Sequence, residues 1–129
     1  MIENTDVLII GAGPSGSVAA AYLRQQNINV IVLEKTQFPR IVVGESLIPR
    51  SMDHFEEAGL LPYLEQQNFE VKPGARFIRG NQICIFDFSQ KFGDGKDWTL
   101  QVPRADFHLT LVNAIVDKGA DLRYNEEVI

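Results

Sequence analysis

The stretch DVLIIGAGPSGSVAAAYL, residues 6–23, constrains the fold more than any other part of the chain. Its apolar run Asp6–Ile10 is short and continuous, as in a buried parallel strand, and the glycine-rich block Gly11–Gly16 interrupts it. Small side chains then dominate Ser15–Gln26, where we expect a helix pressed closely on a sheet. A second apolar strand, Val30–Glu34, completes a β-α-β unit with parallel strands and a right-handed crossover.

The glycine block matches the pattern G-x-G-x-x-G, in which each glycine has a physical role. Gly11 allows a tight turn, Gly13 lets a pyrophosphate approach the backbone, and Gly16 lets helix and strand pack closely. The N–H groups at the start of the helix face the phosphate charge. Pro14 has no N–H, but at this position the group would have no partner within the helix. Glu34 can accept hydrogen bonds from ribose hydroxyls, and its charge would repel a 2′-phosphate. The pattern therefore predicts an adenine dinucleotide other than NADP, and it leaves FAD and NAD both open.

In the rest of the chain, the spacing of apolar residues changes twice. After a loop over Lys35–Leu47, helical spacing predicts three helices: Pro49–Ala58, Pro62–Gln67 and Ala105–Lys118. Between them, over residues 70–103, apolar and polar residues alternate in ARFIRG, QICIFDF and WTLQV, which predicts an inserted antiparallel meander. A last strand is expected over Asp121–Val128. We therefore predict one α/β domain over residues 1–129, a Rossmann-like β-α-β fold with an inserted β-meander. A doubly wound sheet needs more strands than these, so we expect the N-terminal part of a longer FAD/NAD(P)-binding domain.

Composition narrows the class of protein. The chain has 129 residues, 45% of them hydrophobic and 22% charged, which is typical of a globular domain. Its net charge of −5, with no Lys/Arg cluster, argues against nucleic-acid binding. No apolar run is long enough for an integral membrane segment, and no basic start indicates a signal peptide, so a cytoplasmic location is expected. Cys84 is interpreted as a buried small hydrophobe. His54 and His108 lack partners at metal spacing, so they are expected at the surface or the edge of the core, and no metal site is predicted.

Three stretches resemble the start of FAD-dependent enzymes in the p-hydroxybenzoate hydroxylase group. The first is GAGPSG together with VLEK. The second, FPRIVVGESLIP, is similar to a loop that carries an Arg and a Gly-Glu-Ser beside the cofactor in flavin-dependent halogenases and geranylgeranyl reductases. The third, Gln101–Val128, is similar to a later helix and strand of that group, where an Arg at the helix entrance contacts the cofactor. Together the three stretches favour FAD.

The resemblance implies a set of cofactor contacts in this chain. Glu34 would bind the ribose, Lys35 would lie beside the adenosine, and a backbone group near Val128 would meet the adenine. Arg40 and Arg104 would face phosphate or ribose oxygens, where a guanidinium fork suits paired acceptors. The complete implied set is Gly11, Ala12, Gly13, Pro14, Ser15, Gly16, Glu34, Lys35, Arg40, Glu45, Ser46, Arg104 and Val128.

Other interpretations of single residues remain open. Arg40 is also consistent with an ordinary surface charge in a loop, and Arg104 with a cap on local backbone. Glu45 and Ser46 would lie near the flavin end of the cofactor. Lys72, five residues before a phenylalanine, has a spacing similar to that of the lysine with which flavin-dependent halogenases guide hypohalous acid. A lysine at the edge of a strand has the same pattern.

The resemblance implies a flavin-dependent oxidoreductase: a monooxygenase, a dehydrogenase or reductase, or a halogenase-like enzyme acting on a small-molecule substrate. The chain lacks the group's later Gly-Asp-Ala-type motif and its substrate-binding sheet, so we expect the remainder of a longer flavoprotein to supply both. Two alternatives follow from the same loop. One is a non-catalytic nucleotide-binding fragment, and the other is an NAD-linked dehydrogenase domain.

Overall fold

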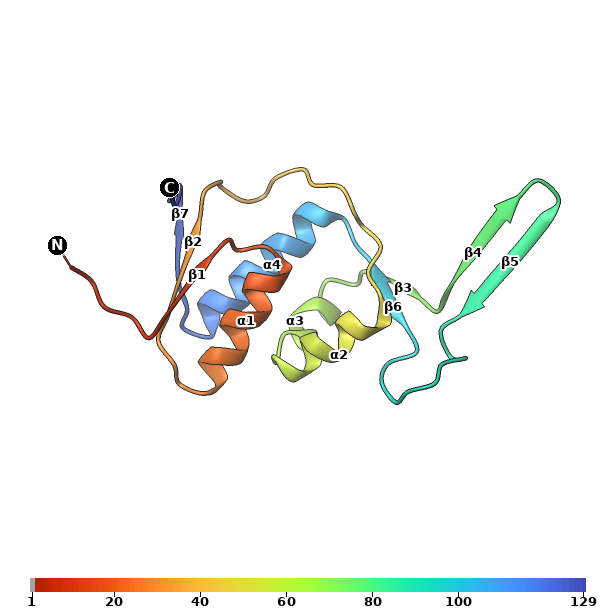
Figure 1. Cartoon of the computed structure of the whole chain (residues 1–129), viewed down its shortest axis with the longest axis horizontal. Helices are drawn as coiled ribbons and strands as arrows, with labels where there is room; N and C mark the ends of the chain where they lie inside the picture. Colours follow the sequence, from red (N-terminus) through yellow and green to blue (C-terminus); the bar gives the residue numbers. More distant parts are fainter. Residues whose placement is uncertain (1) are drawn as a thin grey trace.

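Three parallel strands form one end of the molecule in the computed structural model, which describes residues 2–129 (Figure 1). They are β1 (Val7–Ile10), β2 (Val30–Glu34) and β7 (Asp121–Tyr124), in the order β1-β2-β7. Both pairings are parallel, as the predicted β-α-β unit requires. The α/β fold class is therefore confirmed.

Two helices cover one face of this sheet. Helix α1 (Pro14–Gln25) links β1 to β2, and α4 (Arg104–Asp117) precedes β7; the two helices pack against each other as well as against the strands. Figure 1 shows α1 and α4 side by side on the same side of the sheet. Pro14 occupies the first turn of α1, as predicted, where its missing N–H has no intrahelical partner to lose.

The two faces of the sheet differ sharply in burial. Val30 and Val32 on β2 point toward the helices and are buried. Leu8 and Ile10 on β1 point the other way, and Ile10 is 66% exposed. The expectation of a wholly buried first strand was therefore wrong, because no helix within residues 2–129 covers this second face. Its apolar sequence still has the composition of a strand covered on both faces.

The hydrophobic core lies between α4 and the remaining helices. On the predicted helix α4 an apolar stripe of Phe107, Leu111 and Ile115 is buried together with Val112. Helices α2 (Pro49–Glu57) and α3 (Leu61–Glu65) pack beside it and contribute buried Met52, Phe55, Leu61 and Leu64. Gly59 follows α2 with φ +66°, a left-handed conformation that suits glycine at the end of a helix. These helices begin and end within a residue or two of their predicted bounds.

The antiparallel region forms two separate pairs instead of one meander. Strands β4 (Gly74–Arg79) and β5 (Gln82–Asp87) form a hairpin, whereas β6 (Thr99–Gln101) pairs with β3 (Glu70–Lys72). Strand β3 was not predicted, because three residues give too short an alternation to recognise. The long connection after β5 carries the chain back to β3, so β5 and β6 do not pair. In Figure 1 the hairpin projects away from the helices.

The hairpin is exposed on both of its faces. Phe77 is 62% exposed, and Ile85 and Phe86 are exposed as well. Cys84, expected to be buried, is exposed on β5. The apolar sequence led to the wrong expectation because nothing within residues 2–129 packs over this hairpin.

Candidate functional site

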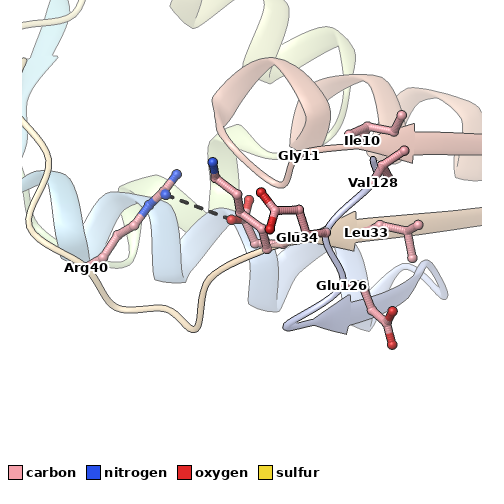
Figure 2. A pocket seen from close by; sticks show the side chains of 9 residues that line it. Ile10, Gly11, Leu33, Glu34, Arg40, Glu126 and Val128 are labelled. Carbon is pink, nitrogen blue, oxygen red and sulfur yellow. Dashed lines mark ion pairs between the residues drawn. The ribbon is translucent and has the colours of Figure 1, made fainter.

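A cleft of about 340 Å³ opens where β1 and β2 end (Figure 2). Parallel strands bring their carboxyl ends to one edge of a sheet, which is where ligands bind in open α/β folds. The first residue of the glycine block, the end of β2 and the segment after β7 meet there. The lining residues are Ile10, Gly11, Leu33, Glu34, Lys35, Arg40, Glu126, Glu127 and Val128.

Glu34 is the last residue of β2 and is only 3% exposed. One carboxylate oxygen, Oε2, accepts a hydrogen bond from the Ala12 N–H at 3.0 Å. The other, Oε1, accepts from the Thr36 N–H at 3.0 Å and from the Thr36 hydroxyl at 2.9 Å. Glu34 therefore ties the glycine block to the chain that leaves β2.

These contacts keep Glu34 ionised. Burial alone would raise the pKa of its carboxyl, but the Ala12 and Thr36 N–H groups, the Thr36 hydroxyl and the Arg40 charge together hold the pKa below its ordinary value of 4.5. A buried carboxylate has about four lone-pair sites, and three protein donors occupy this one. Glu34 is thus a charged acceptor with capacity for one more donor.

The glycine block has the geometry that its pattern predicts. Gly11 has φ +97°, which suits glycine, and its N–H donates to the Leu33 carbonyl at 2.7 Å. At Gly16 an added Cβ would lie 2.0 Å from the Gly11 carbonyl oxygen, so helix and loop are in direct contact. At Gly13 an added Cβ would meet no atom within 4 Å among the described residues. Gly13 thus faces open space, while Gly16 is packed.

The start of α1 carries no side-chain cap among the described residues, and its first turn contains no acidic residue. Gly13 is the N-cap, and Pro14 and Ser15 line a second hollow with Val18 and residues of α2. Helix N-termini carry partial positive charge from their N–H groups.

Arg40 reaches the cleft from the loop after β2. Its Nη1 donates to the Thr36 hydroxyl at 3.0 Å and lies 3.9 Å from Glu34 Oε1; Figure 2 shows this ion pair as a dashed line. Its Nε is buried and has no hydrogen-bond partner within residues 2–129. The guanidinium also lies over the Phe38 ring, 5.1 Å from its centroid. Arg40 is therefore fixed beside Glu34 with donor capacity unused.

The segment after β7 closes the cleft. Asn125 has φ +60° and ends the strand four residues before the predicted end at Val128. Glu126 then donates its N–H to the Glu34 carbonyl at 3.2 Å. Val128 consequently lines the cleft from a loop and not from a strand.

Glu45, Ser46, Arg104 and Lys72 form a second group that does not line this cleft. Ser46 pairs with Gln101 in an isolated antiparallel bridge, and the Val102 N–H donates to the Glu45 carbonyl at 2.8 Å. The Lys72 ammonium reaches the Ser46 hydroxyl across β6. The Gly-Glu-Ser loop and Lys72 therefore belong to one small antiparallel layer.

Arg104 stands at the first position of α4, above this layer. It donates from Nη1 to the Gly44 carbonyl and from Nε to His108 Nε2 at 2.7 Å. Its expected role as a backbone cap and its role as a ligand donor are compatible, because a guanidinium has five N–H groups.

The structure thus brings Gly11, Glu34, Lys35, Arg40 and Val128 together and leaves the Gly-Glu-Ser loop in a neighbouring group. The sequence did not indicate that Thr36 contacts Glu34 or that His108 contacts Arg104. Thr36 follows Glu34 by two residues, the spacing of a local side-chain turn, and His108 follows Arg104 by one helical turn. His54 is at the surface as expected, but His108 is in the core. Residues 2–129 contain no cluster suited to a metal ion, and no helix among them could span a membrane.

Strand, glycine loop, helix and buried acidic residue at a second strand define a dinucleotide-binding α/β protein of the Rossmann type. Comparison with known proteins defines the class further. The tryptophan halogenase family matches residues 6–122, and the chain belongs to that family of FAD-dependent halogenases.

The individual relatives include two halogenases and a flavoprotein/dehydrogenase. The chain is 36% identical over 106 residues to the flavin-dependent halogenase armH5 of Armillaria mellea, covering 81% of this chain and 20% of the relative. The crystal structure of a flavoprotein/dehydrogenase from Cytophaga hutchinsonii matches with 47% identity and a TM-score of 0.92, over 96% of this chain and 31% of that one. The myxobacterial chondrochloren halogenase CndH, an FAD-dependent enzyme, matches with 31% identity and a TM-score of 0.87, over 99% and 30%.

The chain therefore spans a fifth to a third of the length of these relatives. The predicted resemblance to flavin-dependent halogenases is confirmed, and so is the choice of FAD as the cofactor of its family.

Proposed function

We propose that this chain is the FAD-binding N-terminal part of a flavin-dependent halogenase and holds the adenosine diphosphate half of FAD in the cleft beside Glu34. The observation that carries the proposal is the buried, ionised Glu34 carboxylate at the mouth of that cleft. A carboxylate held there suits a ribose hydroxyl donor and disfavours a 2′-phosphate.

The residues present fit the cofactor. Gly13 leaves open space where a pyrophosphate approaches the backbone, and the uncapped start of α1 favours its charge. Arg40 has a buried Nε without a partner in the described chain, next to the acceptor site. Three aliphatic side chains, Ile10, Leu33 and Val128, form the apolar part of the cleft that an adenine ring requires.

Each group then has a role that follows from its chemistry. Glu34 accepts from the ribose, Arg40 donates to ribose or phosphate oxygens, and the backbone near Val128 meets the adenine edge. Arg104 directs its remaining donors to the cofactor from the other side of the Gly-Glu-Ser loop. FAD, when bound, supplies the redox chemistry, and the protein supplies binding and orientation.

Lys72 is the residue of this chain that we propose for the halogenation step. Its ammonium contacts Ser46 of the Gly-Glu-Ser loop, so it stands beside the segment expected near the flavin end. A lysine there can donate hydrogen bonds to hypohalous acid and direct it to a small-molecule substrate.

A flavin-dependent dehydrogenase is the second candidate. One observation favours it: the relative with 47% identity over almost the whole chain is a flavoprotein/dehydrogenase. In that case Lys72 would have no part in the redox step.

FAD binding tests the first part of the proposal. The full-length protein, stripped of flavin, is titrated with FAD while flavin fluorescence is followed, and NAD and NADP are tried as competitors. We expect saturable FAD binding that neither competitor prevents. After Glu34→Ala we expect binding at least about tenfold weaker, because the bond to the cofactor is lost together with the three internal bonds that hold the glycine block and Thr36. Binding of NAD in place of FAD would overturn the proposal.

Lys72→Ala separates the halogenase from the dehydrogenase. In the full-length protein with reduced flavin, oxygen, halide and an aromatic substrate, we expect the variant to lose halogenated product while flavin reoxidation continues. The matched control is Lys91→Ala, which removes an exposed lysine from the loop after β5. Halogenation that is unaffected by Lys72→Ala removes the proposed role of this lysine.

A further inference from the structure

His108 lies in the core on α4, one turn after Arg104, and is 2% exposed. Its ring packs against Phe38 and Phe107, with centroids 5.5 and 5.9 Å away. Its Nε2 accepts a hydrogen bond from the Arg104 Nε–H at 2.7 Å. An imidazole that accepts at one nitrogen is neutral and carries its proton on the other, here Nδ1.

The Nδ1 side of the ring makes no comparable contact. It is buried and has no hydrogen-bond partner within residues 2–129. A buried donor without a partner destabilises the folded state, so packing alone is a poor reason for a histidine at this position. The hydrogen bond from Arg104 is the contact that makes use of an imidazole nitrogen as an acceptor.

Arg104 is held from two sides through this contact. Nε is fixed by His108 on its own helix, and Nη1 donates to the Gly44 carbonyl in the Gly-Glu-Ser loop. The guanidinium also lies over the Phe107 ring, 5.9 Å from its centroid. These contacts fix the direction of the remaining N–H groups of the guanidinium.

The charges around His108 favour the neutral ring. Burial lowers its pKa below the ordinary 6.5, and the positive charges of Arg104 and of Arg40 on the loop after β2 lower it further, against the opposing effect of Glu34 on β2. Tyr124 on β7 lies behind Phe38, and its own pKa is raised by burial and by Glu34, so it stays neutral as well. Protonation of His108 would place a third positive charge beside two arginines and remove the acceptor for Arg104.

We propose that His108 is a positioning residue: as a neutral imidazole it orients the Arg104 guanidinium, and acidification releases that guanidinium and weakens cofactor binding. The orientation of Arg104 stands on its own contacts, whereas the effect on the cofactor rests on the proposed function.

Three variants of the full-length protein test this proposal. His108→Gln keeps an acceptor that does not titrate, His108→Leu removes the acceptor, and His54→Gln changes an exposed histidine on α2 as a control. The dissociation constant of FAD is measured for each between about pH 5 and pH 8, the range in which histidines titrate. The pKa of Glu34 is held below 4.5, so its carboxylate stays ionised across this range.

We expect the wild type and His54→Gln to bind FAD about tenfold more weakly at the acid end, with the loss beginning only below the ordinary histidine pKa of 6.5, because a charge-assisted contact is lost. His108→Gln should bind like the wild type at neutral pH and show no acid loss. His108→Leu should bind about tenfold more weakly at every pH, for the same reason. An acid loss that persists in His108→Gln, or unchanged FAD affinity in His108→Leu, overturns the proposal.

A measurement without FAD keeps this test separate from the proposed function. Nitrogen NMR of the histidine rings reports which nitrogen carries the proton, and we expect the Nδ1–H form for His108. If the protein does not bind FAD at any pH, the proposed function fails while the tautomer still tests the Arg104 contact. An Nε2–H form contradicts that contact directly.

Discussion

The strands of the β-α-β unit and of the β4–β5 hairpin both carry large apolar side chains, but their environments differ. In the first, one face of β2 is buried under α1 and α4, and the loop at its end is held by Glu34. In the second, large apolar side chains such as Phe77 are exposed on a two-stranded ribbon. The difference teaches that apolar strand residues are buried only where helices such as α1 and α4 cover them. Within residues 2–129 no element packs over the apolar side chains of the hairpin.

The largest expected effect separates the two regions by stability. Phe107→Ala, at a position that is 0% exposed, should reduce the free energy of unfolding by about 4 kcal/mol because it leaves a cavity. Phe77→Ala on the hairpin should reduce it by less than about 1 kcal/mol. Chemical denaturation of both variants checks the difference. An equal loss in both would mean that the hairpin is packed in the full-length protein.

Gly16→Ala tests the tight packing of the glycine loop. An added Cβ would lie 2.0 Å from the Gly11 carbonyl oxygen, so the loop and α1 must separate. We expect a loss of about 3 kcal/mol in the free energy of unfolding, the cost of overpacking a rigid contact. The matched control on the hairpin is Gly80→Ala, where no atom of the described chain lies within 4 Å of the added Cβ, although its φ of +58° adds a small strain. Gly16→Ala with wild-type stability contradicts the packed loop.

Glu34 gives the β-α-β unit a sensitivity to acid. Its folded-state pKa is below 4.5, so its carboxylate stabilises the fold above that value, and this stabilisation is lost as the pH falls through the lowered folded-state pKa. Glu34→Gln should lose about 2 kcal/mol at neutral pH and should show a flatter acid dependence. Denaturation curves between neutral pH and pH 3 check this, with Glu127→Gln as a control on the same cleft. Parallel acid curves for Glu34→Gln and the wild type would show that Glu34 does not titrate with unfolding.

Cys84 offers the smallest perturbation. It is exposed on β5, so a thiol reagent should modify it in the native protein without denaturant and with little change in stability. Absorbance of the released chromophore measures the reaction. Modification only after unfolding would show that the hairpin is covered in the full-length protein.

The sequence predicts the local parts of the fold well. Strand, glycine loop and helix could be recognised because each glycine, and Glu34 at the end of β2, has a role set by its neighbours in sequence. Helical spacing likewise predicts the helix that carries the buried residues from Phe107 to Ile115.

Long-range features were harder to predict. The pairing of β6 with β3, and not with β5, depends on how the chain returns after a long connection. The exposure of Cys84 and Ile10 depends on what covers each sheet, which apolar sequence does not specify. His108 was expected at the surface or the edge of the core because it lacks a partner at metal spacing. Its burial and its hydrogen bond to Arg104 are not evident from the spacing alone.

The central claim is that the cleft beside the glycine block holds the pyrophosphate-bearing half of FAD. The most direct measurement compares FAD affinity and stability in Gly13→Ala of the full-length protein. An added Cβ at Gly13 meets no atom of the described chain within 4 Å, and the backbone φ of −66° accepts alanine. We predict unchanged stability with FAD binding at least about tenfold weaker, since the methyl group occupies the space of the pyrophosphate. FAD binding by Gly13→Ala as tight as by the wild type would contradict the account.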